Sequence, residues 1–538
     1  MSIFMTWDKK PFFAGTYFPP KSHYGMPGFP DLLDVIVSQW NNNRRKLLQS
    51  AEQIITHLKS AESGDKNIDD EELIKRAMQI FSESFDEING GFSSAPKFPT
   101  PHNLLFLMLY AKHKQDSDAL KMAEKTLLQM RKGGIFDHIG YGFSRYSTDK
   151  YFLAPHFEKM LYDNALLIIA YSAAYYLTNN EIYLDTAEKT TEYILREMTS
   201  ADGGFYSAQD ADSEGVEGKY YTFTLDEIIN VLGEEKGKRF AESFDITSNG
   251  NFEGVNILNL LKSNDLESDF SEEIHKLYDY RKKRTNLHLD NKILLSWNSL
   301  MIAALSMFYR VSRNEKYLNA VVNAQKFIEE NMCDVVQLFT SWRDGKHSEK
   351  SFLDDYAFYI ASLIELYNST LDKIYLEKAE RFCDEAVRQF EDCQRDGFYL
   401  CEASYTEIFM NPKETYDGAI PSGNSVMAYN FVRMFQLTEN EKYRKLTEKQ
   451  FEFLSVQAQD YPAGNSVFLL SKLLYENPPE HIVIAVKHKS DFQEIQKELP
   501  FLANVSVVLD SVDYPLKNDK VTYYVCKNHT CSPPTNIL

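Results

Sequence analysis

The stretch DNALLIIAYSAAYYL, residues 163–177, decides the fold. It is apolar on nearly every side, so a helix formed from it must be buried all round. The apolar run begins at Asn164, and five further apolar segments also begin at an Asn or Asp. Their starting residues are Asn103, Asn298, Asp355, Asn424 and Asn465. Six buried helices that recur in this way predict a closed inner ring.

More polar segments alternate with the buried six, and each has a single apolar face. They are expected near residues 71–87, 118–131, 181–198, 315–331, 373–391 and 440–457. Because a helix that is apolar on one face covers a core from outside, these segments predict an outer layer. The fold class is therefore mainly α, an (α/α)6 barrel of six hairpins over about residues 70–477. The Asn and Asp residues that start the inner helices are typical N-caps.

One end of this barrel is expected to carry the functional site. The long loops lead from outer to inner helices, so they gather where the N-termini of the inner helices point. The interval between Asn164 and Asn298 is longer than the later intervals, which predicts an insertion at about residues 200–295. We expect this insertion to drape over the mouth of the barrel.

Two smaller regions flank the barrel. Residues 1–62 contain two short strand-like runs and a helix over about residues 31–59, too little to fold alone. Residues 480–538 alternate apolar strands with a helix near 490–499, which is typical of a small α/β unit.

Composition disfavours several classes of partner. The formal net charge of −20 repels phosphate backbones and anionic lipid surfaces. The sequence has no leader-like segment and no apolar run long enough to span a bilayer, so we expect a cytoplasmic protein. The 36 Phe, 33 Tyr and 4 Trp suit a core or the walls of a ligand cleft. We expect a sugar or other small-molecule ligand, no nucleic acid and no membrane, and leave the oligomeric state open.

Neither the cysteines nor any known sequence motif indicates a bound metal or cofactor. Six cysteines without a C-x-x-C favour neither a disulfide scaffold nor a zinc ribbon. Cys526 and Cys531 are close enough in sequence to form a functional thiol or metal pair, or they are two isolated reduced cysteines. Asp210–Gly215 imitates the start of a calcium loop, but Tyr221 stands where a bidentate Glu is required. We therefore expect neither a metal nor a cofactor.

Polar residues gather just before the inner helix that begins at Asn164, and thus at the expected mouth. This cluster and the loop before it contain His138, Arg145, His156, Glu158, Tyr162 and Asp163. Carboxyl and imidazole groups exchange protons in general acid–base catalysis, and a guanidinium binds carboxylates or paired hydroxyls. The alternative is that these residues cap the helix and brace the loop by ion pairs.

The expected catalytic residues are Glu158, Asp163, Asp355, His156 and His138. The expected substrate-binding residues are Arg145, Tyr162, Asn164, Asp210, Asp212, Trp297, Asn298 and Asn424. Asp355 is expected to face the funnel because it shares the register of Asn164, although it too can serve as an N-cap. Glu158, Asp163 and Asp355 should then lie in one pocket.

Two reactions fit such a site. An inverting glycosidase needs two carboxyl groups about 6.5–9.5 Å apart, which the acids at the mouth can supply. A sugar epimerase needs two histidines that face each other, and His102, His138 and His156 are the candidates.

Several motifs resemble one protein family. They are GTYFPP at 15–20, APKFP at 95–99, GGIFDHIGYGFSRYSTD at 133–149, PHFEKMLYDNA at 155–165, GGFYSAQDADSEGVEGKYY at 203–221, DDYAF at 354–358, PSGNS at 421–425 and YVCKNHTCSPP at 524–534. The chain is similar to the thioredoxin-domain proteins that include spermatogenesis-associated protein 20. The resemblance implies a thioredoxin-like domain followed by a barrel similar to six-hairpin glycosidases and N-acylglucosamine 2-epimerases.

The chain departs from this family at its start. In the family the thioredoxin-like domain begins before the equivalent of Ser2 and carries its cysteine motif there, so we expect residues 1–62 to be the remnant of an N-terminally truncated domain. We expect a carbohydrate-binding or carbohydrate-transforming barrel. The alternative is a non-catalytic module that binds a protein or sugar, with redox function only in full-length relatives.

Overall fold

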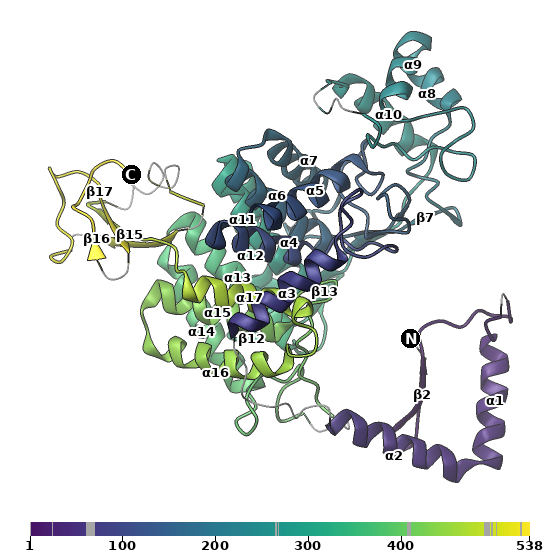
Figure 1. Ribbon diagram of the computed structural model, residues 1–538, viewed down its shortest axis with the longest axis horizontal. Coiled ribbons are helices and arrows are strands. Elements are labelled where there is room, and N and C mark those ends of the chain that lie inside the picture. The colour runs from purple at the N-terminus through teal and green to yellow at the C-terminus, as the bar shows by residue number, and fades with distance from the viewer. Residues whose placement is uncertain are drawn as a thin grey trace.

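The computed structural model contains 17 α-helices and a set of mostly short strands among the residues that it describes (Figure 1). The described residues are 2–23, 25–60, 70–263, 266, 268–405, 410–488, 495, 499–501, 503–509, 511–527 and 530–538. Within these residues, every helix is too short or too polar to cross a membrane.

Six helices form a closed inner ring at the centre of the molecule (Figure 1). They are α4 (Pro101–Lys114), α6 (Leu161–Thr178), α11 (Leu295–Ser312), α13 (Leu353–Thr370), α15 (Gly423–Thr438) and α17 (Ser466–Glu476). Each contacts the next in chain order, and α17 contacts α4, which closes the ring. These are the six apolar segments of the sequence, so the predicted (α/α)6 barrel is confirmed.

Six more polar helices surround the ring. They are α3 (Asp70–Ser84), α5 (Ser117–Lys132), α7 (Glu181–Glu197), α12 (Glu315–Asn331), α14 (Lys373–Phe390) and α16 (Glu441–Gln457). Five of them pack on the inner helix of their own hairpin, and α3 packs on the 3-10 turn η1 (Pro462–Asn465) ahead of α17. True N-caps occur in this outer layer, where the side chains of Asp116, Asn180, Asn314, Asp372 and Asn440 accept first-turn N–H groups.

The Asn residues of the inner helices have a different role from the N-caps that we expected. Asn164 lies inside the first turn of α6, where its Oδ1 accepts the N–H of Phe143 at 2.7 Å. Its Nδ2 donates to the carbonyl oxygen of the same Phe143 at 3.0 Å. Two more inner helices repeat this amide clamp, in the pairs Asn298–Phe205 and Asn424–Phe398. Each clamp fixes an aromatic residue that follows a glycine in the loop after the preceding outer helix.

In α13 a tyrosine replaces the amide. The hydroxyl of Tyr356 accepts the N–H of Leu338 at 3.3 Å and donates to a carbonyl of the same loop. Counted from the helix starts, Tyr356 therefore occupies the position of Asn164, and Asp355 that of Asp163. The expected register of Asp355 is wrong by one residue, because the repeat does not require an Asn or Asp at its clamp position.

Short strands join the loops at the N-terminal ends of the inner helices. They are β3 (Tyr146–Ser147), β4 (Pro155–His156), β5 (Lys159–Met160), β6 (Ala208–Gln209), β7 (Asp212–Ser213), β8 (Val216–Glu217), β9 (Leu289–Asp290), β10 (Ile293–Leu294), β11 (Cys333–Asp334), β12 (Gln337–Leu338), β13 (Ser341–Arg343) and β14 (Lys346–His347). Strand order β5-β6-β9 and β10-β13-β14 links loops from neighbouring hairpins. The mouth of the barrel thus has a hydrogen-bonded rim.

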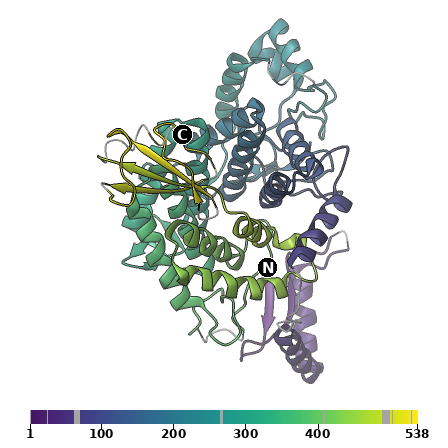
Figure 2. The same ribbon diagram turned by 60° about the vertical axis from the view of Figure 1, so that its left-hand side comes forward.

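Three helices project outward beside the mouth (Figures 1 and 2). They are α8 (Leu225–Leu232), α9 (Glu234–Ser243) and α10 (Ser271–Arg284), and they share a small core of their own. Arg281 of α10 joins them to the barrel through two 2.9 Å bonds to Asp137, which also binds Lys159 at 2.8 Å. Burial alone would raise the pKa of Asp137, but the two cations hold it far below its usual range.

The N-terminal segment forms a hairpin and two helices that stand apart from the barrel (Figure 1). β1 (Ser2–Met5) pairs antiparallel with β2 (Pro11–Gly15), as predicted. The single expected helix is instead two, α1 (Phe29–Asn42) and α2 (Arg44–Ser60), because a run of three Asn, poor helix formers, ends the first. Several apolar side chains, including Trp7, Val35 and Val37, are exposed.

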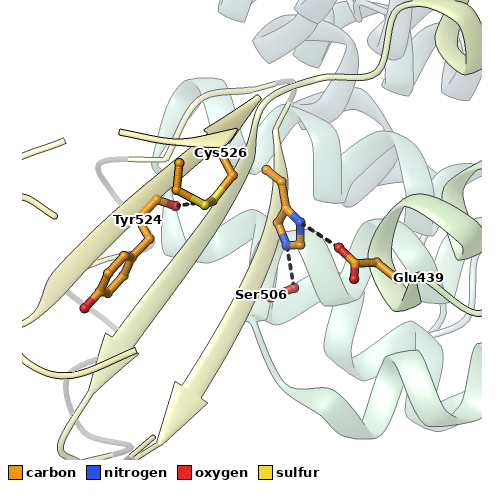
Figure 3. The surroundings of a disulfide bond; sticks show 6 residues. Glu439, Ser506, Tyr524 and Cys526 are labelled. Carbon is orange, nitrogen blue, oxygen red and sulfur yellow. Dashed lines mark hydrogen bonds and ion pairs between the residues drawn. A yellow bond between two sulfur atoms is a disulfide. The ribbon is translucent and has the colours of Figure 1, made fainter. Parts of the chain in front are cut away.

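The C-terminal unit is a four-stranded sheet of order β16-β15-β17-β18. Its strands are β15 (His481–Val486), β16 (Asn504–Leu509), β17 (Thr522–Lys527) and β18 (Thr530–Cys531). Cys526 and Cys531 face each other across the β17–β18 pair and form a disulfide (Figure 3), which corrects the expectation of reduced cysteines or a metal pair. Most of the helix expected near 490–499 lies outside the described residues.

This sheet packs against the C-terminal ends of the inner helices. Tyr367 of α13 donates to the carbonyl of Val505 at 2.8 Å, and Arg433 of α15 bonds to Asn504. The ring of Phe501 lies 5.1 Å from that of Tyr176 on α6. The barrel therefore has a floor made by the end of the chain, opposite its mouth.

Candidate active site

Asp163 is a buried carboxyl in the first turn of α6. Its residue is 4% exposed, and Oδ2 has no hydrogen-bond partner among the described residues. Burial raises the pKa of Asp163 well above its usual range, and the nearby Glu158 adds to this while Arg145 opposes it. A raised pKa favours the protonated form of this carboxyl, which is the form that can donate a proton.

A second, more open carboxyl lies beside Asp163. Glu158 Oε2 is 3.2 Å from Nη1 of Arg145 and 3.7 Å from Nε2 of His156, and its side chain is 28% exposed. The other nitrogen of His156 lies 2.7 Å from Oε1 of Glu217 in the β7–β8 hairpin. The structure thus brings together Arg145, His156 and Glu158 as expected, and adds Glu217, which we had not predicted.

Aromatic rings border these charged groups on two sides. The ring of Tyr146 lies between those of Phe98 and His156, tilted against the first and stacked on the second, with centroid distances of 4.8 and 5.3 Å. The ring of Tyr162 meets that of Trp297 edge-on at 4.8 Å. Phe98 is 44% exposed, so the first stack presents an open apolar surface of the kind that binds the face of a ring.

Two further acids begin α13, and they have different surroundings. Asp355 is buried and fully bonded, since it accepts the N–H of Ser296 at 3.1 Å and the hydroxyl of Thr340 at 2.8 Å. Asp354 is only partly buried, and its Oδ1 accepts the N–H of Gly423 at 2.9 Å. Burial is the largest cause that raises both pKa values, to about 6 for Asp355 and about 7 for Asp354.

A cavity of about 180 Å³ runs along the barrel axis and is called the axial cavity below. All six inner helices line it, with side chains that include Leu105, Leu166, Leu300, Phe358, Val426 and Val467. Residues four apart lie on one face of a helix, so the next turn toward the mouth places Tyr162 above Leu166 and Asp354 above Phe358. By this register Asp354, rather than the expected Asp355, stands at the funnel.

The three candidate histidines occupy separate places. His138 is buried, donates from Nε2 to the carbonyl of Gly133 at 3.0 Å and contacts Arg131 through Nδ1 at 3.4 Å. Burial lowers its pKa to about 3. His102 lines the axial cavity, and burial lowers its pKa to about 4. Neither His102 nor His138 has a described contact with His156. These three histidines therefore do not form the facing pair that an epimerase needs.

The other candidate residues lie around the site. Asp210 and Asp212 are exposed on the rim, where Asp212 pairs in register with Glu217. The amides of Asn164, Asn298 and Asn424 hold the clamped loops described above. Within the described residues, His, Cys, Asp and Glu side chains nowhere gather in threes that could hold a metal ion.

Comparison with known proteins gives relatives along the whole chain. The family model described as Thioredox_DsbH, protein of unknown function, DUF255, matches residues 1–59. Spermatogenesis-associated protein 20 of Homo sapiens is 32% identical, over 99% of this chain and 77% of that protein. Uncharacterized protein B0495.5 of Caenorhabditis elegans is 31% identical, over 100% of this chain and 82% of that protein.

Among solved structures, a D-mannose isomerase is similar in fold. Its TM-score is 0.51 at 13% sequence identity, over 76% of this chain and 96% of that one. At this identity the likeness extends to the architecture of the barrel alone.

Proposed function

This chain belongs to the family of spermatogenesis-associated protein 20, and on that premise we propose that the mouth of its barrel binds and transforms a sugar by acid–base chemistry. One observation carries the proposal. Asp163 holds a carboxyl oxygen that is buried without a described partner, within reach of the charges of Arg145 and Glu158. Unpaired buried polar groups are costly, so they are commonly kept where a ligand will use them.

The two neighbouring carboxyls have the unlike surroundings that acid–base catalysis requires. Asp163 is buried, and burial raises its pKa and favours its protonated form, so it suits the general acid. Glu158 is partly exposed and paired with Arg145, so it suits the base that receives a proton from water or a hydroxyl. This arrangement favours hydrolysis by two carboxyls over epimerisation by two histidines.

The aromatic groups fit the same ligand class. The stack of Phe98, Tyr146 and His156 gives a flat surface for the apolar face of a pyranose ring. Trp297 gives a second wall beside Tyr162. The D-mannose isomerase that shares the fold acts on a monosaccharide, which makes mannosides and glucosides the first ligands to test.

The test combines calorimetric titration against a sugar panel with analysis of products. We expect binding and slow turnover of at least one glycoside, and a loss of turnover of about 10²–10⁴-fold in Asp163→Asn, since the amide cannot donate the proton. The matched control is Asp226→Asn, an exposed first-turn acid of α8. Unchanged turnover in Asp163→Asn would refute the mechanism, and binding without any turnover would support a non-catalytic sugar-binding module.

A further inference from the structure

The axial cavity below the mouth is unlike a sugar site. Its walls are mostly aliphatic and aromatic side chains from all six inner helices, and His102, Lys112 and Glu365 are the exceptions. A sugar placed there would leave its hydroxyl groups without partners, at a cost of about 1–3 kcal/mol each. Its volume of about 180 Å³ is close to that of a cavity of roughly 150 Å³ in another protein that stays dry and binds benzene.

Small side chains keep this axis open. Ala173, Ala303 and Ala361, on the neighbouring helices α6, α11 and α13, all line the cavity. Ala173 and Ala361 are only partly buried although they lie inside the ring, which shows that the space beside them is accessible. A leucine or phenylalanine at any of the three would be equally apolar and would fill the axis. The alanines therefore keep open a space that larger apolar residues would close.

The two ends of the cavity differ in polarity. Phe501 and the exposed Lys112 line the far end, where Glu365 binds Arg310 at 2.6 Å and accepts the hydroxyl of Tyr429 at 3.0 Å. Near the mouth, His102 is 1% exposed and lines the cavity, and its Nδ1 has no described hydrogen-bond partner. A ligand that enters from the mouth therefore meets one unpaired polar atom and then apolar walls.

We infer that the axial cavity receives the apolar aglycone of an amphipathic glycoside, an alkyl or aryl group of about six carbons, while the sugar lies at the mouth. This inference rests on the proposed function, because Tyr162, which lies one turn above the cavity on α6, belongs to the proposed sugar site beside Trp297. Such a ligand places its glycosidic oxygen near the boundary, where His102 Nδ1 is available. A free sugar leaves the axis empty, and a long lipid tail exceeds its volume.

The experiment compares ligands that differ in chain length alone. Methyl, butyl and hexyl β-glucosides and α-mannosides are titrated into the full chain, together with 1-butanol and 1-hexanol. We expect affinity to rise about fourfold for each added methylene, the gain for moving a methylene out of water. The rise should disappear in Ala303→Phe, which fills the axis, and persist in Ala201→Phe, a substitution at an exposed loop residue.

Folding of each variant is checked by its melting temperature, and Ala361→Leu gives a milder filling variant if Ala303→Phe unfolds. Affinity that is independent of chain length, or a chain-length effect that survives filling of the axis, would overturn the inference. If the alcohols show the chain-length effect and bind as tightly as the matching glycosides, the proposed sugar site fails. That result would still support binding of apolar ligands in the axial cavity.

Discussion

The carboxyl of Asp354 lies at the barrel mouth and keeps its proton to a higher pH than an ordinary aspartate does. Burial and the adjacent Asp355 raise its pKa to about 7, from a usual value of 3.8. Between these values the unfolded chain releases the proton while the folded chain keeps it, so unfolding becomes more favourable as pH rises. Asp354 therefore destabilises the fold increasingly from about pH 4 to 7, and fully above that.

Asp354→Asn should remove this pH dependence. We expect the variant to gain stability relative to the parent between pH 4.5 and 8, by about 3 kcal/mol in the free energy of unfolding. Urea unfolding at a series of pH values measures the difference. The exposed Asp226→Asn should show no such trend. A difference that is constant with pH would show that the carboxyl ionises normally.

The amide clamps give a second prediction at the residue scale. Asn298→Ala leaves the buried N–H and carbonyl of Phe205 without partners, which should cost about 2–4 kcal/mol. Asn323→Ala, at an exposed position on α12, should change stability by less than about 0.5 kcal/mol. Equal effects in denaturant unfolding would contradict the structural role of the clamp.

At the scale of elements, the spacing of apolar residues predicted the helices well. Each helix is either buried on all sides or buried on one face, and both arrangements leave a clear pattern in the sequence. The inner and outer helices therefore begin within a few residues of their predicted starts. The choice between Asp354 and Asp355 was not predictable in this way, since adjacent residues differ by about 100° in direction and both are acids. Glu217 was missed because a hairpin far along the chain brings it to His156.

The β17–β18 hairpin leads to a prediction about redox activity. Thiol–disulfide exchange needs a thiolate of low pKa beside a resolving partner. Among the described free cysteines, burial raises the pKa of Cys333 to about 11, and Cys383 is fully buried. We expect insulin reduction by this chain to stay at background, with or without serine at Cys526 and Cys531. Turnover that these two substitutions abolish would reveal a working dithiol in the hairpin.

On the scale of the whole molecule, the barrel and the C-terminal sheet share one interface. Phe501 is 5% exposed and contacts Tyr176, and the guanidinium of Arg310 lies 5.4 Å from its ring. Phe501→Ala should therefore destabilise the chain by about 3–5 kcal/mol. Val512→Ala, at a 95% exposed position of the same unit, should have almost no effect.

Calorimetry and unfolding followed by fluorescence measure this difference. We expect the Phe501→Ala transition to shift as one cooperative step, because the floor and the ring are packed together. A separate early transition of the C-terminal unit, with the barrel unshifted, would show that the sheet is an independent domain.

The contact between α4 and α17 also sets the order in which the chain can assemble on the ribosome. The first inner helix emerges early, yet its neighbour on one side is the last inner helix to be made, and the floor at Phe501 comes later still. Until then the apolar lumen stays open to water, and loop closure over most of the chain delays the final step. We therefore expect a partly synthesised chain to expose the apolar faces of its inner helices until α17 packs on α4, a state in which chains tend to aggregate.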